Sequence, residues 1–191
     1  MQRLGVFYAT REGQAQKVAE HVQVALLARG LEVSIHEVKD AESVAALARS
    51  EAVVIVGSVH LGKHEAELVE FVRAHRPALD AMPAAFLSVC GSESAVEHGA
   101  TPDARAAGAE DVANQLRTFA EATGWRPARV VPVAGALVYT HYNPLVRWVM
   151  KHISKTNALP TDTSRDYEFT DWGAIDALAT NVADEMHAAL S

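Results

Sequence analysis

The fold is decided near the start of the chain, by an apolar run and the polar turn that follows it: Leu4-Gly5-Val6-Phe7-Tyr8-Ala9-Thr10-Arg11-Glu12-Gly13-Gln14. Residues 4–8 are typical of a short buried strand. After the turn, apolar residues recur at the 3.6-residue spacing of an amphipathic helix, namely Ala15, Val18, Ala19, Val22, Ala25 and Leu26. The stretch therefore predicts a strand that passes directly into a helix, the first half of a βαβ unit.

Apolar runs and helical patterns keep alternating along the rest of the chain. Further strands are expected at 31–35, 52–56, 84–89 and 129–137, and helices at 41–49, 68–79, 112–120 and 175–186. Five strands with crossover helices predict an α/β protein, a three-layer αβα sandwich around a five-stranded parallel sheet. We expect the strand order 2-1-3-4-5, because it makes the loops after the first, third and fourth strands neighbours.

Two segments exceed what this minimal pattern needs. Residues 93–111 are typical of a polar loop, and residues 138–170 form an insertion between the last strand and the last helix, which Asp171 can cap. Long loops in compact domains usually carry function or are disordered. Because no repeat or linker interrupts the pattern, we expect a single domain over residues 1–191.

Composition narrows the class of protein. The chain has 191 residues, of which 49% are apolar, and a formal charge of −7. That charge argues against general nucleic-acid binding, which needs a basic surface. The single cysteine, Cys90, excludes an internal disulfide and fits a reducing compartment. No signal-peptide pattern precedes the first strand, and no apolar stretch approaches the roughly 20 residues that span a bilayer, so we expect a cytoplasmic protein.

Three loops rich in glycine or hydroxyl residues follow the first, third and fourth expected strands. Their candidate cofactor-binding residues are Thr10, Arg11, Glu12, Gly13, Gln14 and Ala15; Ser58, Val59, His60, Leu61, Gly62 and Lys63; and Ser88, Val89, Cys90 and Gly91. Because loops at the carboxyl ends of parallel strands meet at one edge of the sheet, these residues predict a shared site. Such a site suits a planar cofactor that carries a phosphate.

The first loop carries the phosphate hypothesis. It lies at a strand-to-helix turn, where unpaired backbone N–H groups and the positive end of the helix dipole favour an anion. Gly13 lets the backbone approach closely, and Thr10 can add a hydroxyl. An ordinary turn with a capping threonine would have the same residues. The nine histidines show no metal-ligand spacing, and no residue is assigned a catalytic role.

The Thr10–Gln14 loop resembles the phosphate-binding signature of flavodoxins. The chain as a whole is similar to the bacterial menaquinone-dependent protoporphyrinogen oxidases, and the likeness covers nearly its full length, including the insertion. The other residues that carry it are Gly57, Ser58, Gly62 and His64; Ala134-Gly135-Ala136-Leu137 followed by Tyr139; and Tyr167 with Thr170-Asp171-Trp172. Ala15 departs from the flavodoxin signature, which usually has threonine there, so one hydroxyl contact to phosphate should be missing.

The resemblance implies a flavodoxin-like fold and FMN as the cofactor. It also implies the oxidation of protoporphyrinogen IX to protoporphyrin IX in haem biosynthesis, with electrons passed to a respiratory quinone. The alternatives are a flavodoxin-type electron carrier, an FMN-dependent NAD(P)H:quinone reductase, and a degenerate domain that no longer binds FMN. No aromatic residue occurs in the second or third loop, which favours an open flavin ring and hence an enzyme.

Basic residues suggest contacts with the flavin and with the substrate. Arg11, His60, Lys63 and His64 would favour an anionic two-electron-reduced flavin if they face the ring, and would have no such effect if they point to solvent. The candidates for substrate contact are Lys63, Tyr139, Arg147 and Lys151, and the basic ones among them could pair with the propionates of the porphyrinogen. Packing within the insertion would explain Tyr139 and Arg147 equally well.

Residues 143–155 predict a helix capped by Asn143, with Pro144 in its first position. Leu145, Val146, Val149, Met150 and Ile153 share its apolar arc, and Arg147, Lys151 and Lys155 the opposite one, with Trp148 at the boundary. A basic amphipathic helix in an acidic protein suits an anionic membrane, which would place the protein on the inner face of the cell membrane, or a lipophilic substrate. The alternative is a helix packed on its own domain.

Overall fold

The computed structural model describes residues 3–137, 139–140, 143–156 and 159–188. Its main sheet has the parallel strand order β2-β1-β3-β5-β6, and a short strand, β4, pairs antiparallel with β3. The strands are β1 (Arg3–Ala9), β2 (Glu32–Glu37), β3 (Ala52–His60), β4 (Lys63–His64), β5 (Ala84–Cys90) and β6 (Arg129–Ala134). Counted over the parallel strands alone, this is the predicted order 2-1-3-4-5.

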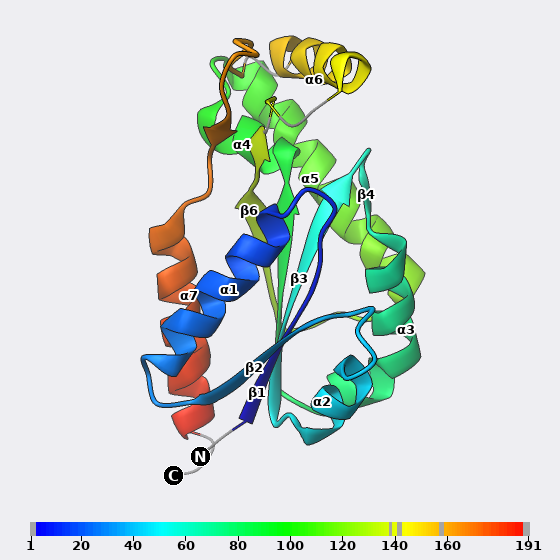
Figure 1. Cartoon of the computed structure of the whole chain (residues 1–191), viewed down its shortest axis with the longest axis vertical. Helices are drawn as coiled ribbons and strands as arrows, with labels where there is room; N and C mark the ends of the chain where they lie inside the picture. The colour runs from blue at the N-terminus through cyan, green and yellow to red at the C-terminus, as the bar shows by residue number, and fades with distance from the viewer. Residues whose placement is uncertain (1–2, 138, 141–142, 157–158, 189–191) are drawn as a thin grey trace.

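Helices cover both faces of the sheet and complete the predicted three layers (Figure 1). One face carries α1 (Gln14–Leu27) and α7 (Trp172–Ala188), and the other carries α2 (Ser43–Arg49), α3 (Ala66–Asp80) and α5 (Pro102–Thr123). The buried strands divide their side chains between two cores, because successive residues of a strand point to opposite faces. Val54 packs in the core under α1 and α7, and its neighbour Ile55 packs in the core under α3 and α5.

The segment 57–63 differs from the predicted loop. β3 continues to His60, and the chain turns back through Leu61 and Gly62 into β4, so most of this segment is a β-hairpin. Leu61 and Gly62 have φ angles of 48° and 78°, the positive values that a two-residue type I′ turn requires. The hairpin lies at the carboxyl edge of the sheet, where the predicted site belongs.

The prediction of a polar loop at 93–111 is wrong. The chain there forms α4 (Gly91–His98) and the first half of α5. Thr101 caps α5, because its Oγ1 accepts a hydrogen bond from the backbone N–H of Ala104 at 3.1 Å. The two helices pack so closely that a Cβ on Gly108 would lie 2.8 Å from the carbonyl oxygen of Ser92. This contact depends on tertiary packing, which no periodicity in the segment indicates.

The last predicted strand, 129–137, is divided in two at Gly135. β6 ends at Ala134, and β7 (Ala136–Leu137) leaves the main sheet to pair antiparallel with β8 (Tyr167–Glu168). The backbone of Gly135 joins both parts, since its N–H donates to the carbonyl of Cys90 and its carbonyl accepts from Phe169, each at 3.1 Å. The break redirects the chain into the insertion.

The insertion contains the predicted helix, α6 (Pro144–Thr156). Leu137, Tyr139 and Leu159 form a small apolar core with Ala95 of α4, and Met150 of α6 packs against it. The side chains of the other predicted apolar-arc residues Val146, Val149 and Ile153 lie outside the described part of the structure. Among the described residues, none of the helices is both long and apolar enough to span a membrane.

Candidate cofactor-binding site

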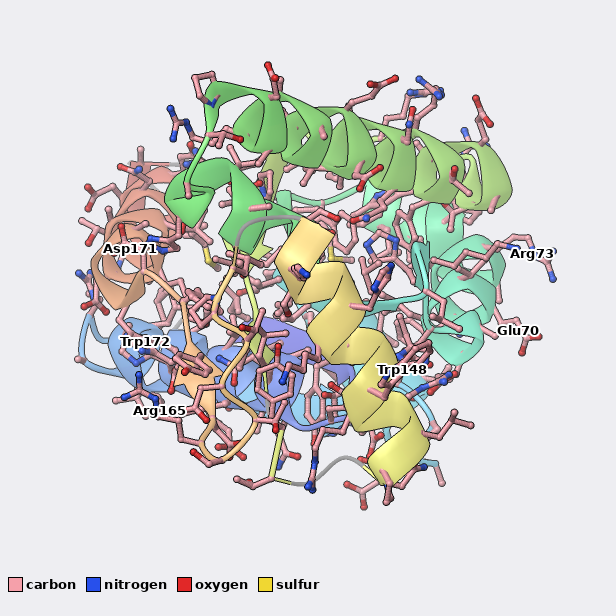
Figure 2. The ribbon with its side chains drawn as sticks, turned by 90° about the horizontal axis from the view of Figure 1, so that it is seen from above. Glu70, Arg73, Trp148, Arg165, Asp171 and Trp172 are labelled. Atoms are coloured by element: carbon pink, nitrogen blue, oxygen red, sulfur yellow. The ribbon has the colours of Figure 1, made fainter. Side chains whose placement is uncertain are left out.

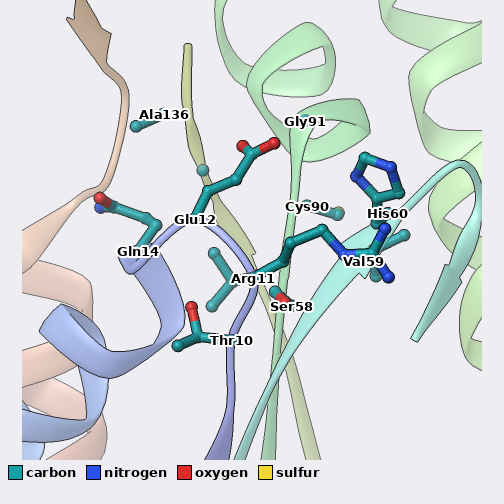
Figure 3. Close-up of a pocket in the computed structure, with 12 residues that line it drawn as sticks. Thr10, Arg11, Glu12, Gln14, Ser58, Val59, His60, Cys90, Gly91 and Ala136 are labelled. Carbon is teal, nitrogen blue, oxygen red and sulfur yellow. The ribbon is translucent and has the colours of Figure 1, made fainter. Parts of the chain in front are cut away.

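A cleft lies at the carboxyl edge of the sheet, with an empty volume of about 390 Å³ that includes space open to solvent (Figure 3). It brings together the β1–α1 turn, the end of β3, the β5–α4 junction and the break after β6. The lining residues are Thr10, Arg11, Glu12, Gln14, Ser58, Val59, His60, Val89, Cys90, Gly91, Gly135 and Ala136. The three predicted segments therefore meet at one site.

The β1–α1 turn presents the amino end of α1 to this cleft. Gly13 has a φ of 88°, a left-handed conformation that glycine adopts without strain, and the position of its missing Cβ is open space. Thr10 stabilises the turn, since its Oγ1 accepts a hydrogen bond from the Gly13 N–H at 3.0 Å. The helix has no side-chain cap and no acidic residue in its first turn, so its backbone N–H groups and positive dipole end are available to an anion.

Ala15 does not contribute its side chain to the cleft. Its side chain is fully buried in the core beneath α1 and does not line the cleft. Gln14 does line it, and its Nε2 donates to Thr170 Oγ1 at 2.8 Å, while that hydroxyl donates to the carbonyl of Ala134. This chain of hydrogen bonds ties α1 to the segment after β8.

The β3–β4 hairpin supplies one wall of the cleft through Ser58, Val59 and His60. The hydroxyl of Ser58 is buried and has no hydrogen-bond partner among the described residues. A buried hydroxyl without a partner is costly, so this atom is suited to a polar group of a ligand. Leu61, Gly62 and Lys63 form the tip of the hairpin and its return strand, and none of them lines the cleft.

The third segment supplies Val89, Cys90 and Gly91. Burial raises the pKa of the Cys90 thiol to about 11, so this group stays protonated at neutral pH. Ser88 is buried and does not line the cleft, and its Oγ lies 2.9 Å from Nε2 of His64. Gly135 and Ala136 form the remaining wall and were absent from the predicted site. In the sequence, these two residues belong to the Ala134–Leu137 motif, which carries the family resemblance but was not predicted to bind the cofactor.

The predicted cluster of positive charge is smaller than expected. Burial lowers the pKa of His64 to about 4, so this imidazole is neutral at pH 7. Arg11 donates from Nη2 to Glu65 Oε2 at 2.9 Å, and this hydrogen bond raises the pKa of the guanidinium. Because Glu65 is buried beside it, the charge of Arg11 is largely balanced inside the protein. Lys63 faces a different depression, between α3 and α5.

The sequence profile of the flavodoxin domain family matches residues 5–164, most of the chain, including the turn at the head of α1 and the β3–β4 hairpin. The chain belongs to the flavodoxin domain family. Membership implies a flavin cofactor, and the resemblance drawn from the sequence is confirmed.

Curated relatives extend this likeness beyond the common fold. A protein of Escherichia coli strain K12 named protoporphyrinogen IX dehydrogenase (quinone) is 30% identical over 181 residues, which cover 93% of each chain. A protein of the same name from Leishmania major is 27% identical, over 93% of this chain and 73% of that one. Oxidised flavodoxin 1 from Bacillus cereus superposes with a TM-score of 0.51 at 14% identity, over 96% of this chain and 98% of the other, and shows the fold alone.

The predicted substrate residues of the insertion are not at the flavodoxin cleft. Tyr139 is fully buried, and its hydroxyl lies 2.7 Å from Ser154 Oγ and 3.0 Å from the carbonyl oxygen of Pro160. Arg147 donates from Nε to the carbonyl of Tyr139 at 2.9 Å. Both residues hold the insertion together in this structure, so Tyr139 does not face a substrate. Lys151 is exposed on α6.

Proposed function

We propose that this chain is an FMN-dependent enzyme that oxidises protoporphyrinogen IX to protoporphyrin IX and passes the electrons to a quinone. The observation that carries the proposal is the 30% identity to protoporphyrinogen IX dehydrogenase (quinone), which spans 93% of both chains and therefore includes the insertion. A flavodoxin that only carries electrons would need the domain and the cleft, but not this shared carboxyl-terminal third.

The residues of the cleft fit a phosphate-bearing flavin. The uncapped amino end of α1 would hold the phosphate through backbone N–H groups, and Thr10 would keep the turn in place. Ser58 offers a buried hydroxyl without a protein partner among the described residues, which suits a polar edge of the ring system. When bound, FMN supplies an acceptor for two electrons that can pass them on to a second substrate.

The walls of the cleft favour an enzyme over a carrier. Val59, Val89 and the protonated thiol of Cys90 are uncharged, and no Phe, Tyr or Trp among the described residues lines the cleft. No aromatic side chain there would cover a flat ring, so a substrate could approach it. Lys151, exposed on α6, is our candidate partner for a substrate propionate.

The direct test mixes FMN-loaded protein with protoporphyrinogen IX without oxygen, adds a quinone, and follows porphyrin fluorescence. We expect porphyrin to form faster than in matched samples that lack the protein or contain it without FMN. Rates equal to those of the protein-free sample would contradict the proposal. Rapid bleaching of the flavin by NADH or NADPH, with no porphyrin formed, would favour an NAD(P)H:quinone reductase instead.

We further propose that α6 holds the protein on an anionic membrane surface, where a lipid-soluble quinone resides. Leu145 and Trp148 of α6 are 71% and 67% exposed, and Leu61 at the tip of the hairpin is 79% exposed. The hairpin and α6 lie at the same end of the molecule, and α6 lies across that end (Figures 1 and 2). Exposed Lys151 and Lys155 add positive charge to the helix.

Flotation with vesicles tests this contact. We expect the protein to float with vesicles that contain anionic lipid, and to float less with neutral ones. The double variant Leu145→Gln, Trp148→Gln should lose the binding. The matched control, Val24→Gln with Leu27→Gln, changes two exposed apolar residues of α1 and should retain it. Equal flotation of the two double variants would contradict a role for α6.

A further inference from the structure

A second and larger depression lies between α3 and α5, and β4 of the hairpin closes it at one end. Its empty volume is about 830 Å³, and it shares no lining residue with the cleft. We call it the α3–α5 groove. His64 of β4 lines it at the hairpin, Val69 and Arg73 line it from α3, and Phe119 and Ala122 line it from α5. The cofactor assignment leaves this site without a ligand.

The floor of the groove is apolar. Phe119 is 3% exposed, with its ring centroid 4.5 Å from that of Phe86 and 4.6 Å from that of His64. Because His64 is neutral at pH 7, it adds no charge to this wall. Val69 and Ala122 extend the apolar surface along the two helices. An elongated hydrocarbon or a small ring would therefore lose contact with water on entering the groove.

The rim carries an excess of positive charge in an otherwise acidic protein. Lys63 and Arg73 line the groove with one acidic residue, Glu70, and Figure 2 shows Glu70 and Arg73 projecting from the outer side of α3. Among the described residues, neither cation forms an ion pair, although the chain as a whole has a formal charge of −7. An apolar floor beneath two such cations is complementary to an apolar molecule with an anionic head.

We propose that the α3–α5 groove binds a small amphiphilic carboxylate. Its apolar body lies on Val69 and Phe119, and its carboxylate lies between Lys63 and Arg73. Guanidinium and ammonium groups both form charge-assisted hydrogen bonds with carboxylates. The site goes beyond the proposed oxidation of protoporphyrinogen and does not depend on it, because no residue of the flavin cleft takes part.

Decanoate is the probe, and the full-length protein is titrated while backbone amide NMR shifts are recorded. We expect saturable shifts confined to residues 63–73 and 115–122. Decanol, which has the same chain and no charge, should bind about tenfold more weakly. Octanoate, which is two methylenes shorter, should bind about fifteenfold more weakly, since each buried methylene contributes about fourfold in affinity. Equal affinity for decanoate and decanol would overturn the carboxylate assignment.

Two pairs of variants locate the site. Ala122→Trp fills the groove and should abolish binding, whereas Ala113→Trp places the same side chain at an exposed position of the same helix, outside the groove. Arg73→Gln should weaken decanoate binding about threefold to tenfold, and Arg49→Gln, at an exposed cation of α2, should not. No saturable shift in the wild type, shifts centred on α6, or full binding by a folded Ala122→Trp variant would each overturn the proposal.

Discussion

His64 shows how one buried residue links stability to pH. Burial holds its pKa at about 4 in the folded protein, against about 6.5 in the unfolded chain. Between these values the unfolded chain binds a proton that the folded protein does not. The free energy of unfolding should therefore fall as the pH drops from 6.5 to 4, by about 3 kcal/mol in all.

Urea denaturation of the wild type and of His64→Gln measures this effect. Glutamine does not titrate, and its amide can replace the hydrogen bond to Ser88. Between pH 7 and pH 4.5 the wild type should lose roughly 2 kcal/mol more stability than the variant. The same pH dependence in both proteins would show that burial does not lower the pKa of His64 in the folded protein.

Arg11 illustrates a second constraint at the scale of the residue. It joins the β1–α1 turn to Glu65, which is 5% exposed and whose Oε1 has no partner among the described residues. Arg11→Ala leaves this carboxylate buried without its cation and should reduce the free energy of unfolding by about 1–3 kcal/mol. Glu65→Gln removes the charge, so Arg11→Ala should cost less in that background. Additive losses in a double-mutant cycle would show that the ion pair does not stabilise the fold.

At the scale of the element, the β3–β4 hairpin has a turn residue poorly suited to its conformation. Leu61 has a φ of 48° although it is not glycine, and its side chain is 79% exposed. Asparagine tolerates this conformation better than leucine. Leu61→Asn should therefore raise the free energy of unfolding by about 0.5–1 kcal/mol, measured by urea denaturation.

The matched change in the same turn should have the opposite sign. Gly62 has a φ of 78°, and Gly62→Ala should lower the free energy of unfolding by about 1 kcal/mol, although the position of the added Cβ is open space. If Leu61→Asn were less stable than the wild type, the leucine would be held by contacts that offset its backbone strain. An exposed leucine at the tip of the hairpin is consistent with the proposed membrane contact.

At the scale of the whole molecule, cofactor binding should appear as thermal stability. A ligand at one hundred times its Kd adds about 2.7 kcal/mol, which for a domain of this size corresponds to a rise in Tm of roughly 5–10 °C. FMN should produce such a rise. Riboflavin, which lacks the phosphate, should produce a smaller one if the amino end of α1 holds the phosphate.

Gly13→Ala provides the control for that thermal measurement. It strains the turn that directs the backbone N–H groups of α1, and should bring the FMN and riboflavin shifts closer together. Equal shifts with the two ligands in the wild type would contradict a phosphate site at α1. The difference in Tm between the unliganded variant and the unliganded wild type measures the effect of backbone strain alone.

Local patterns in the sequence were enough to predict the layers, the strand order and the place of the cleft. Apolar runs of period two and helical arcs of period 3.6 are local signals, and the chirality of βαβ units leaves few ways to connect them. Residues after β1, β3 and β5 could therefore be assigned to one edge before any contact was known. Even the start of α6 at Pro144 followed from a local preference for proline in the first turn.

Which side chains face the cleft, and what charge they carry, depends on contacts between segments that are distant in the sequence. Lys63 and His60 are paired in the hairpin, yet they line different depressions, and only the packing of α3 and α5 beside β4 places Lys63 at the second one. His64 is neutral because Phe86 and Phe119, distant in sequence, exclude water from it. Tyr139 is buried because the insertion builds a core of its own. Burial and desolvation depend on contacts between distant segments, and no local pattern encodes those contacts.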